Sequence, residues 1–242
     1  MSNKLYSMLE LSSLRFPHNK FYALDMRGVE PGEVEAYLKD GLRSFKSRIN
    51  CKSVIIRTGL ANNPEVKLFI APDLDASDNE LIISKMKEAL AFFSQRFGGY
   101  SDAFIIIQEW TPQEDYDYSL NLLRLENDYV IEAVKGDHYN LDRNEHPPTV
   151  IRLSSKGPRI IKSGLGPDDL MLLKRRLRQL FNNYFFEDKC VYEFSLLKER
   201  PSFYQIKKPG KLYKEPISKD EFYKKLRDNH VQFSKKIKRK QT

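Results

Sequence analysis

The feature that most limits the possible folds of this chain is a short, almost continuously apolar run at residues 103–110. Its apolar core is far shorter than the roughly 20 residues that cross a bilayer, so it predicts a buried strand. Residues 116–126 alternate between apolar and polar, and residues 129–134 follow the turn-forming pair Asn127-Asp128. We therefore expect a hairpin at 116–134 that pairs with the central strand 103–110.

Helical periodicity appears at residues 33–47, at 78–97 and after Gly166-Pro167-Asp168, where Asp168 is the expected cap. Further strands are predicted at 53–57, 66–71, 149–153, 159–162, 190–197 and 203–207, and a short charged helix at 219–229. This order predicts an α+β fold of two lobes, with antiparallel-rich sheets and flanking helices. The expected divisions are an N-terminal lobe at 1–102, a C-terminal lobe at 103–215, and a charged helix with a basic tail at 216–242.

The net charge of the chain is +8 over 242 residues, which suits an anionic partner such as a nucleotide or a nucleic acid. Much of the excess lies in the tail at 235–240. That tail is either a solvated terminus or a contact for nucleic acid or a protein partner. The N-terminus lacks the apolar core of a signal peptide, so we expect a cytoplasmic protein with no membrane partner.

The sequence contains no Walker A loop and no G-x-G-x-x-G after a strand, which argues against the phosphate-loop and dinucleotide folds. Five segments, read in order, resemble another class of nucleotide-binding domain. They are Val54-Ile55-Ile56-Arg57-Thr58, Ile105-Ile106-Ile107-Gln108-Glu109-Trp110, Val130-Ile131-Glu132-Ala133-Val134-Lys135-Gly136, Val191-Tyr192-Glu193-Phe194 and Ser202-Phe203-Tyr204-Gln205-Ile206-Lys207-Lys208-Pro209. Their order and spacing resemble the ATP-grasp domain of phosphoenolpyruvate synthase and pyruvate phosphate dikinase.

This resemblance implies that the chain binds ATP and Mg²⁺. It implies that Arg57, Gln108, Glu109, Trp110 and Lys207 bind ATP. Glu193 and Gln205 are implied as the metal ligands, since carboxylate and amide oxygens suit magnesium. We expect Arg57, Glu193, Gln205 and Lys207 to meet in one cleft, with the backbone of residues 108–110 as its adenine wall.

The sequence also departs from the family. Val191 stands where an Asp usually precedes the metal-binding Glu, and Lys207 replaces an Arg. The family's lysine-bearing, glycine-rich segment is missing, although Lys20 is a candidate for its role. The swivel and barrel domains of these enzymes are absent too, so catalysis would require a protein partner or a different acceptor.

Each candidate has a plainer interpretation. Arg57 is equally suited to a surface carboxylate, Gln108 and Glu109 to ordinary strand ends, and Glu193 to a solvent-facing position. Three functions therefore stay open. The first is an ATP-grasp enzyme that transfers phosphate or activates a carboxylate, as a phosphotransferase or a ligase. The second is a basic nucleic-acid-binding protein, and the third is an ATP-grasp scaffold without turnover.

Overall fold

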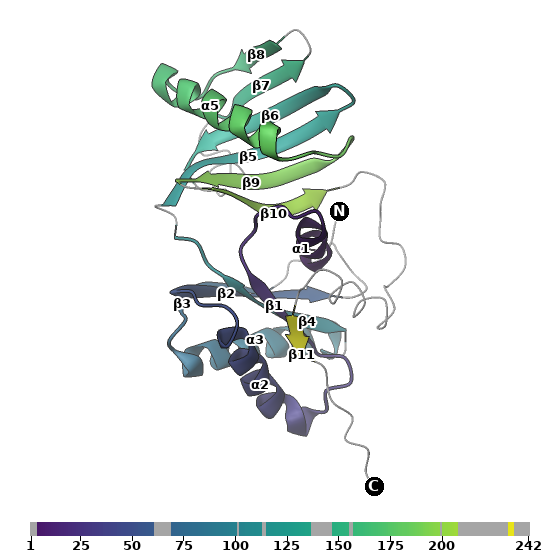
Figure 1. Cartoon of the computed structure of the whole chain (residues 1–242). Helices are drawn as coiled ribbons and strands as arrows, with labels where there is room; N and C mark the ends of the chain where they lie inside the picture. Colours follow the sequence, from purple (N-terminus) through teal and green to yellow (C-terminus); the bar gives the residue numbers. More distant parts are fainter. Residues whose placement is uncertain are drawn as a thin grey trace. The chain divides into compact units, whose positions relative to one another are not determined.

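A computed structural model describes residues 4–60, 69–100, 102–112, 115–136, 147–154, 157–198, 200–207 and 232–234 (Figure 1). The chain is divided into two compact units, and each unit contains its own sheet. Unit 1 comprises Met1–Ser2, Tyr6–His18 and Pro112–Leu212; unit 2 comprises Asn3–Leu5, Asn19–Thr111 and Tyr213–Thr242. The described residues therefore confirm the α+β class and the antiparallel-rich sheets predicted from the sequence.

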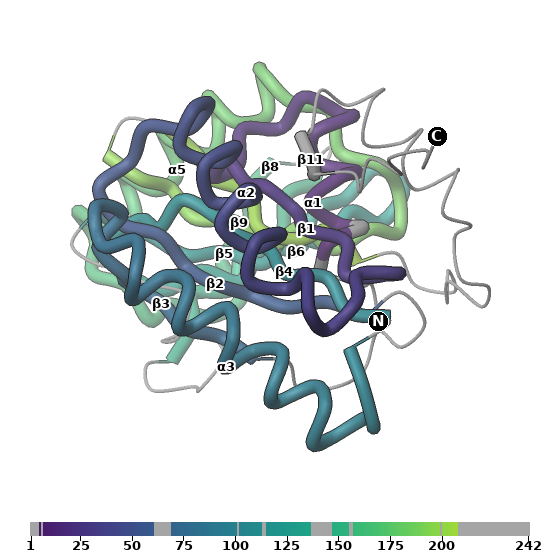
Figure 2. The backbone as a smooth tube through the Cα atoms, turned by 90° about the horizontal axis from the view of Figure 1, so that it is seen from below, coloured from purple at the N-terminus to yellow at the C-terminus, as the bar shows by residue number. Residues whose placement is uncertain are grey.

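Unit 2 is built on a five-stranded sheet in the order β11-β1-β4-β2-β3. Its strands are β1 (Phe21–Asp25), β2 (Ser53–Leu60), β3 (Ile70–Asp75), β4 (Ala103–Glu109) and β11 (Gln232–Ser234). All neighbours are antiparallel except β1 and β11. The short 3-10 helix η1 (Pro31–Glu33) leads into α2 (Val34–Lys46), which packs with α3 (Asn79–Phe97) on one face of the sheet (Figure 2).

Helix α3 follows the sequence rules closely. The Asp78 side chain accepts a hydrogen bond from the Leu81 backbone N–H at 2.9 Å, so one of the orphan donors of the first turn is satisfied. Gly98 ends the helix with φ of 73°, a left-handed conformation that glycine adopts without a steric penalty. Both ends of the predicted helix at 78–97 are confirmed.

Unit 1 is built on a six-stranded antiparallel sheet in the order β10-β9-β5-β6-β7-β8. Its strands are β5 (Tyr116–Leu125), β6 (Asp128–Lys135), β7 (Thr149–Ser154), β8 (Gly157–Lys162), β9 (Val191–Leu197) and β10 (Pro201–Lys207). One face packs against α5 (Pro167–Asn183), which contributes Leu173, Leu177 and Leu180 to the core. Helix α1 (Lys4–Ser13) is tied to β10, since Ser7 Oγ donates to the Ile206 carbonyl at 3.0 Å.

The predicted partner of the central strand was wrong. Strand β4 is buried and central as expected, but it pairs with β1 and β2, whereas the hairpin β5–β6 belongs to the sheet of unit 1. The segment after β4 connects unit 2 to unit 1. The consecutive strands β4 and β5 therefore belong to different sheets and do not pair. The division at Thr111–Pro112 accordingly differs from the boundary expected at 102/103.

Two smaller expectations also change. The strand predicted at 66–71 lies partly outside the described residues, and the observed β3 runs on through Pro72. Proline is tolerated there because β3 is an edge strand whose register shifts at this point. Helix α5 takes Gly166 as its N-cap with Pro167 in its first turn, so Asp168 is a first-turn residue rather than the cap. The helix predicted at 219–229 and the tail at 235–240 lie outside the described residues.

Across the described part of the chain, no helix has both the length and the apolar character needed to span a membrane.

Candidate functional site

A row of polar side chains crosses four strands of unit 1, on the face of the sheet opposite α5. Asn121 on β5 pairs with Glu132 on β6 and with Glu193 on β9, and Glu193 pairs with Gln205 on β10. Their apolar strand neighbours, such as Leu120 and Phe194, point into the α5 core. Because successive side chains of a strand point to opposite faces, the four polar residues share the other face. We call these four residues the polar row.

Glu193 is the most enclosed charge in the polar row. It is 8% exposed, and its Oε1 forms an ion pair with the Nζ of Lys207, two residues after Gln205. Lys207 is much more open to solvent than Glu193, so its ammonium group would gain hydration on leaving, whereas the Glu193 carboxylate would need another cation in its place. The ion pair therefore holds a carboxylate in a protected position with a counter-ion that is able to move.

Asn121 supplies a second oxygen beside Glu193. Its Oδ1 is buried and has no hydrogen-bond partner among the described residues. A buried amide oxygen without a partner carries a desolvation cost of about 1–3 kcal/mol, which a bound cation or donor would offset. The sequence analysis missed Asn121, because an Asn in an alternating strand is ordinary and only the pairing register places it beside Glu193.

A second row of small hydroxyl side chains runs next to the polar row. Ser119, Ser195 and Ser202 lie opposite one another on β5, β9 and β10, and all three are buried. The oxygens of Ser119 and Ser195 are 2.6 Å apart, and Ser119 also bonds to the Gly136 carbonyl at 2.8 Å. Because serine side chains are small, the sheet surface next to the polar row carries little side-chain bulk.

In unit 2, two of the predicted ATP-binding residues lie on one face of the sheet. Arg57 pairs with Ile106, and Gln108 pairs with Ile55, so Arg57 and Gln108 share the face opposite α2 and α3. Gln108 is 5% exposed, and its Oε1 is buried without a hydrogen-bond partner in the described part of the chain. Gln108 therefore offers a second unsatisfied amide oxygen.

Glu109 is the last residue of β4, and Trp110 directly follows the strand. Glu109 lies on the helix-covered side by alternation, and its carboxylate accepts a hydrogen bond from the Lys20 backbone N–H at 3.3 Å. The backbone N–H of Trp110 donates to the Ser53 carbonyl at 3.0 Å, so it is already used within unit 2. Any contact of Trp110 with adenine would therefore use its carbonyl or its indole ring.

The predicted residues thus form two groups. Glu193, Gln205 and Lys207 lie together in unit 1, as predicted from their strands, and Arg57, Gln108, Glu109 and Trp110 lie in unit 2. Convergence of the two groups on one cleft stays a prediction, because they belong to different units.

Magnesium would have few protein carboxylates to bind here. Among the described residues, no group of three or more His, Cys, Asp and Glu side chains has metal-binding geometry. The donors that fit a cation are the Glu193 carboxylate and the amide oxygens of Asn121 and Gln205. This set suits Mg²⁺ that takes most of its ligands from water and nucleotide phosphates.

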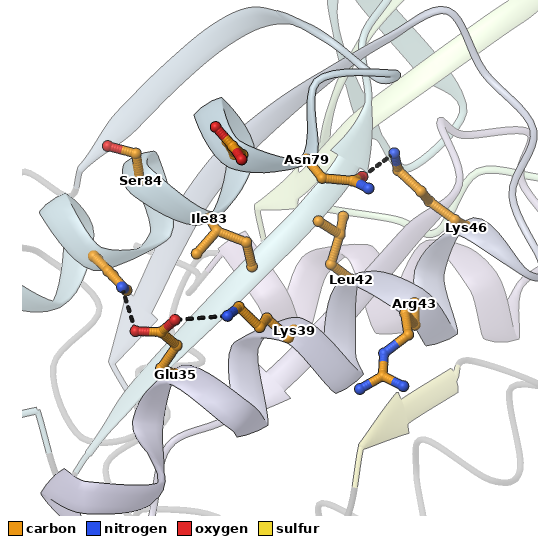
Figure 3. A pocket seen from close by; sticks show the side chains of 10 residues that line it. Glu35, Lys39, Leu42, Arg43, Lys46, Asn79, Ile83 and Ser84 are labelled. Carbon is orange, nitrogen blue, oxygen red and sulfur yellow. Dashed lines mark hydrogen bonds and ion pairs between the residues drawn. The ribbon is translucent and has the colours of Figure 1, made fainter.

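A separate concavity lies between α2 and α3 in unit 2, with a volume of about 690 Å³ (Figure 3). Leu42 and Ile83 form its apolar part, and its polar side chains engage one another. Glu35 accepts hydrogen bonds from Lys39 at 2.6 Å and from Lys87 at 2.7 Å, and these contacts lower its pKa to about 2. Lys46 donates to the Asn79 side chain. The groove is thus bordered by a surface network of matched charges.

No family model matches the sequence, and no curated protein matches it. Similar solved structures include the D-alanine-D-alanine ligase from Helicobacter pylori, with 15% identity and a TM-score of 0.44 over 94% of this chain and 59% of the ligase. An acetyl-coenzyme A synthetase from Ca. Korarchaeum cryptofilum has 11% identity and a TM-score of 0.45, over 85% of this chain and 91% of that chain.

The D-alanyl-alanine synthetase A from Vibrio cholerae matches with 14% identity and a TM-score of 0.40, over 95% of this chain and 61% of the synthetase. The chain therefore spans about three fifths of the length of the two D-alanine enzymes. Scores below 0.5 at such identities describe a remote likeness of fold.

Proposed function

We propose that this chain binds Mg-ATP in the manner of an ATP-grasp protein and uses it for phosphoryl transfer or carboxylate activation. The observation that carries the proposal is the polar row of unit 1: a protected carboxylate at Glu193, flanked by amide oxygens and countered by a movable lysine. Magnesium would neutralise phosphate charge at this position, which lowers the barrier for transfer of a phosphoryl group.

The residues of unit 1 have separable roles in this proposal. Glu193, Asn121 and Gln205 would hold the cation through their oxygens, and Lys207 would exchange the Glu193 carboxylate for a phosphate oxygen. Mg²⁺ and the Lys207 ammonium group repel each other when both contact the Glu193 carboxylate. The Lys207–Glu193 ion pair must therefore open when Mg²⁺ binds. Binding of nucleotide and of metal is therefore expected to be coupled.

Unit 2 would supply Arg57 for the phosphates and residues 108–110 for adenine. Gln108 supports this assignment, because its buried amide oxygen lacks a partner among the described residues and adenine carries an amino donor. We also propose that the ATP site resembles that of phosphoenolpyruvate synthase and that a protein partner takes part in catalysis. The acceptor would be defined by that partner or by a substrate of another class.

One observation favours the alternative of a scaffold without turnover. The Lys207–Glu193 ion pair satisfies both charges with no ligand, as a structural pair does. Turnover assays separate this alternative from an enzyme, whereas binding assays separate both from a protein that does not bind nucleotide.

The proposal is tested by calorimetric titration of ATP into the full chain, with and without Mg²⁺. Glu193→Gln should remove most of the magnesium dependence of ATP affinity. Arg57→Ala should weaken ATP binding by about ten- to a hundredfold, the loss expected from a charge-assisted contact of roughly 1.5–3 kcal/mol.

The matched control is Glu132→Gln, which removes an equal charge from an exposed position of the polar row. Glu132→Gln should leave the magnesium dependence unchanged. Equal effects of the two Glu→Gln changes, or an affinity for ATP that neither Glu193→Gln nor Arg57→Ala alters, would refute the assignment.

A further inference from the structure

Helix α5 of unit 1 presents an outward face that is unlike the surfaces of α2 and α3. Its apolar side chains Leu173, Leu177 and Leu180 are buried against the sheet. Pro167 and Asp168 are exposed in the first turn, and the exposed residues beyond it are Met171, Arg175, Arg178, Gln179, Asn182 and Asn183. Lys174 lies beside them and is half-buried. One helix face therefore anchors α5, while the opposite face is available for binding.

Beyond the first turn of α5, the helix carries cations and no acidic residue; Asp168 and Asp169 lie in that first turn, and Glu187 and Asp188 follow the helix. Residues 170–186 contain Lys174, Arg175, Arg176 and Arg178 but no Asp or Glu. Arg176 turns back to the Asp117 carboxylate and to the carbonyls of Leu197 and Lys198. The other three form no ion pair and no side-chain hydrogen bond with any residue that the structure describes. We call Lys174, Arg175 and Arg178 the α5 ridge.

Most cations of α2 and α3 form ion pairs; of the others, Lys46 bonds to Asn79 and Arg96 lies over the rings of Phe92 and Phe97. Lys39 and Lys87 are paired with Glu35, Arg43 with Asp40, and Lys85 with Glu88. The α5 ridge thus differs from α2 and α3 because three cations without a described partner lie on one helix.

An exposed aromatic ring lies just beyond the end of α5. Phe185 is 75% exposed, although a phenylalanine normally buries most of its surface. The guanidinium of Arg124 lies 4.8 Å from the centre of this ring, and it is held in place by the carbonyls of Glu126 and Phe186. The Phe185 ring is thus backed by a fixed planar cation while much of its surface remains open.

We propose that the α5 ridge and Phe185 bind a single-stranded nucleic acid. Unpaired arginine and lysine side chains on one helix face attract a phosphate backbone, and an exposed ring supplies a stacking platform for a base. Lys174 and Arg178 are separated by about 6 Å along the helix axis, since each residue rises 1.5 Å, so the cations follow one short stretch of a strand.

The geometry favours nucleic acid over a membrane or an acidic peptide. An amphipathic helix binds a membrane through its apolar face, and that face of α5 is buried in the core of unit 1. An acidic peptide would use the cations but has no group that requires Phe185. The stacked Phe185–Arg124 pair is the feature that a nucleobase would use and the other partners would not.

The test measures fluorescence anisotropy of a labelled 20-nucleotide oligouridylate with the full chain over a range of KCl concentrations. Changing Lys174, Arg175 and Arg178 together to Gln should make the slope of log affinity against log salt shallower by about 2. Each phosphate that a cation neutralises contributes roughly 0.7 to this slope, and three contacts are lost. Phe185→Ala should weaken binding about fivefold or more, with an unchanged salt slope, because stacking on a ring does not release counter-ions.

The control variant changes Lys39, Arg43 and Lys46 of α2 to Gln (Figure 3). It removes an equal number of positive charges, three, from another helix. It should keep both the affinity and the salt slope. Circular dichroism melting of every variant shows whether the fold is intact, and all the substituted residues lie at least partly in solvent.

Three outcomes would overturn the proposal. An equal loss in the α2 control and the α5 variant would mean that only net charge matters. Polyglutamate that displaces the oligonucleotide as well as unlabelled oligouridylate does, together with a silent Phe185→Ala change, would indicate an acidic protein partner. Binding of the chain to phosphatidylserine vesicles but not to oligouridylate would indicate a membrane surface.

Discussion

Gly41 in the middle of α2 is expected to resist replacement by alanine, although alanine is the better helix former. A Cβ at this position would lie 2.8 Å from one methyl carbon of Leu24 on β1, 3.0 Å from its Cγ, and closer still to its other methyl carbon. Leu24 is fully buried, so its side chain has little room to move. The helix therefore approaches the sheet at a point where only a hydrogen atom fits.

Two opposing effects determine the magnitude. Alanine in place of glycine stabilises a helix interior by about 1 kcal/mol, whereas an extra methyl group in a packed core costs about 1–3 kcal/mol. We expect Gly41→Ala to change the free energy of unfolding by between about 0 and −2 kcal/mol. In a Leu24→Ala chain, the space is open, so the same Gly41→Ala change should stabilise unit 2 by about 1 kcal/mol.

The assay is urea denaturation followed by the fluorescence of Trp110, the single tryptophan, which lies in unit 2 at the end of β4. Gly32→Ala is the control, because a Cβ at Gly32 would meet no atom within 4 Å. The reasoning is refuted if Gly41→Ala stabilises the wild-type chain by 1 kcal/mol, or if its effect has the same sign and size in both backgrounds.

Three further predictions concern single polar groups. Asp78→Ala removes the cap of α3 and should lower the free energy of unfolding by about 1 kcal/mol, measured by urea denaturation. Burial lowers the pKa of His18 from 6.5, so the folded state favours the neutral ring. The stability that depends on His18 is present above pH 6.5 and lost as the pH falls through its lowered pKa, and the corresponding decrease in urea midpoint should be smaller in His18→Gln. Glu35 should titrate near pH 2 in a carbon-detected NMR titration, and Lys39→Gln should raise its pKa, since the hydrogen bond from Lys39 is the main cause of the shift.

Periodicity was sufficient to predict the helices α2, α3 and α5 and the strands β5 to β10, because each is set by its own residues. The partner of β4 was not predictable in this way. A strand that is buried on both faces can occupy the central position of either sheet. The apolar run of β4 meets that condition in both units, so it does not define which strands pair with it. Sequence proximity favoured the hairpin β5–β6, and the change of unit after Thr111 made that inference wrong.

The candidate site was predictable in the same partial way. The adjacency of Glu193 and Gln205 followed from two neighbouring strands and is confirmed by their register. The place of Asn121 beside Glu193 depends on the register of β5 against β9, where a shift of one residue would turn its side chain to the α5 core. The α5 ridge was invisible for another reason: only the structure shows which cations have partners and which do not.

Helix α1 leaves the ribosome long before its partner strand β10 is synthesised. Ser7 bonds to the carbonyl of Ile206, and the Phe203 backbone N–H bonds to the Pro17 carbonyl at 2.8 Å. The residues Ser7 and Ile206 are separated by 199 positions. At about 5–20 residues per second, the ribosome needs roughly 10–40 s to produce β10 after α1. During that interval the first helix to emerge lacks its partner strand, so the apolar side chains Leu11 and Phe16 are left to nascent-chain contacts or to chaperones until unit 1 closes.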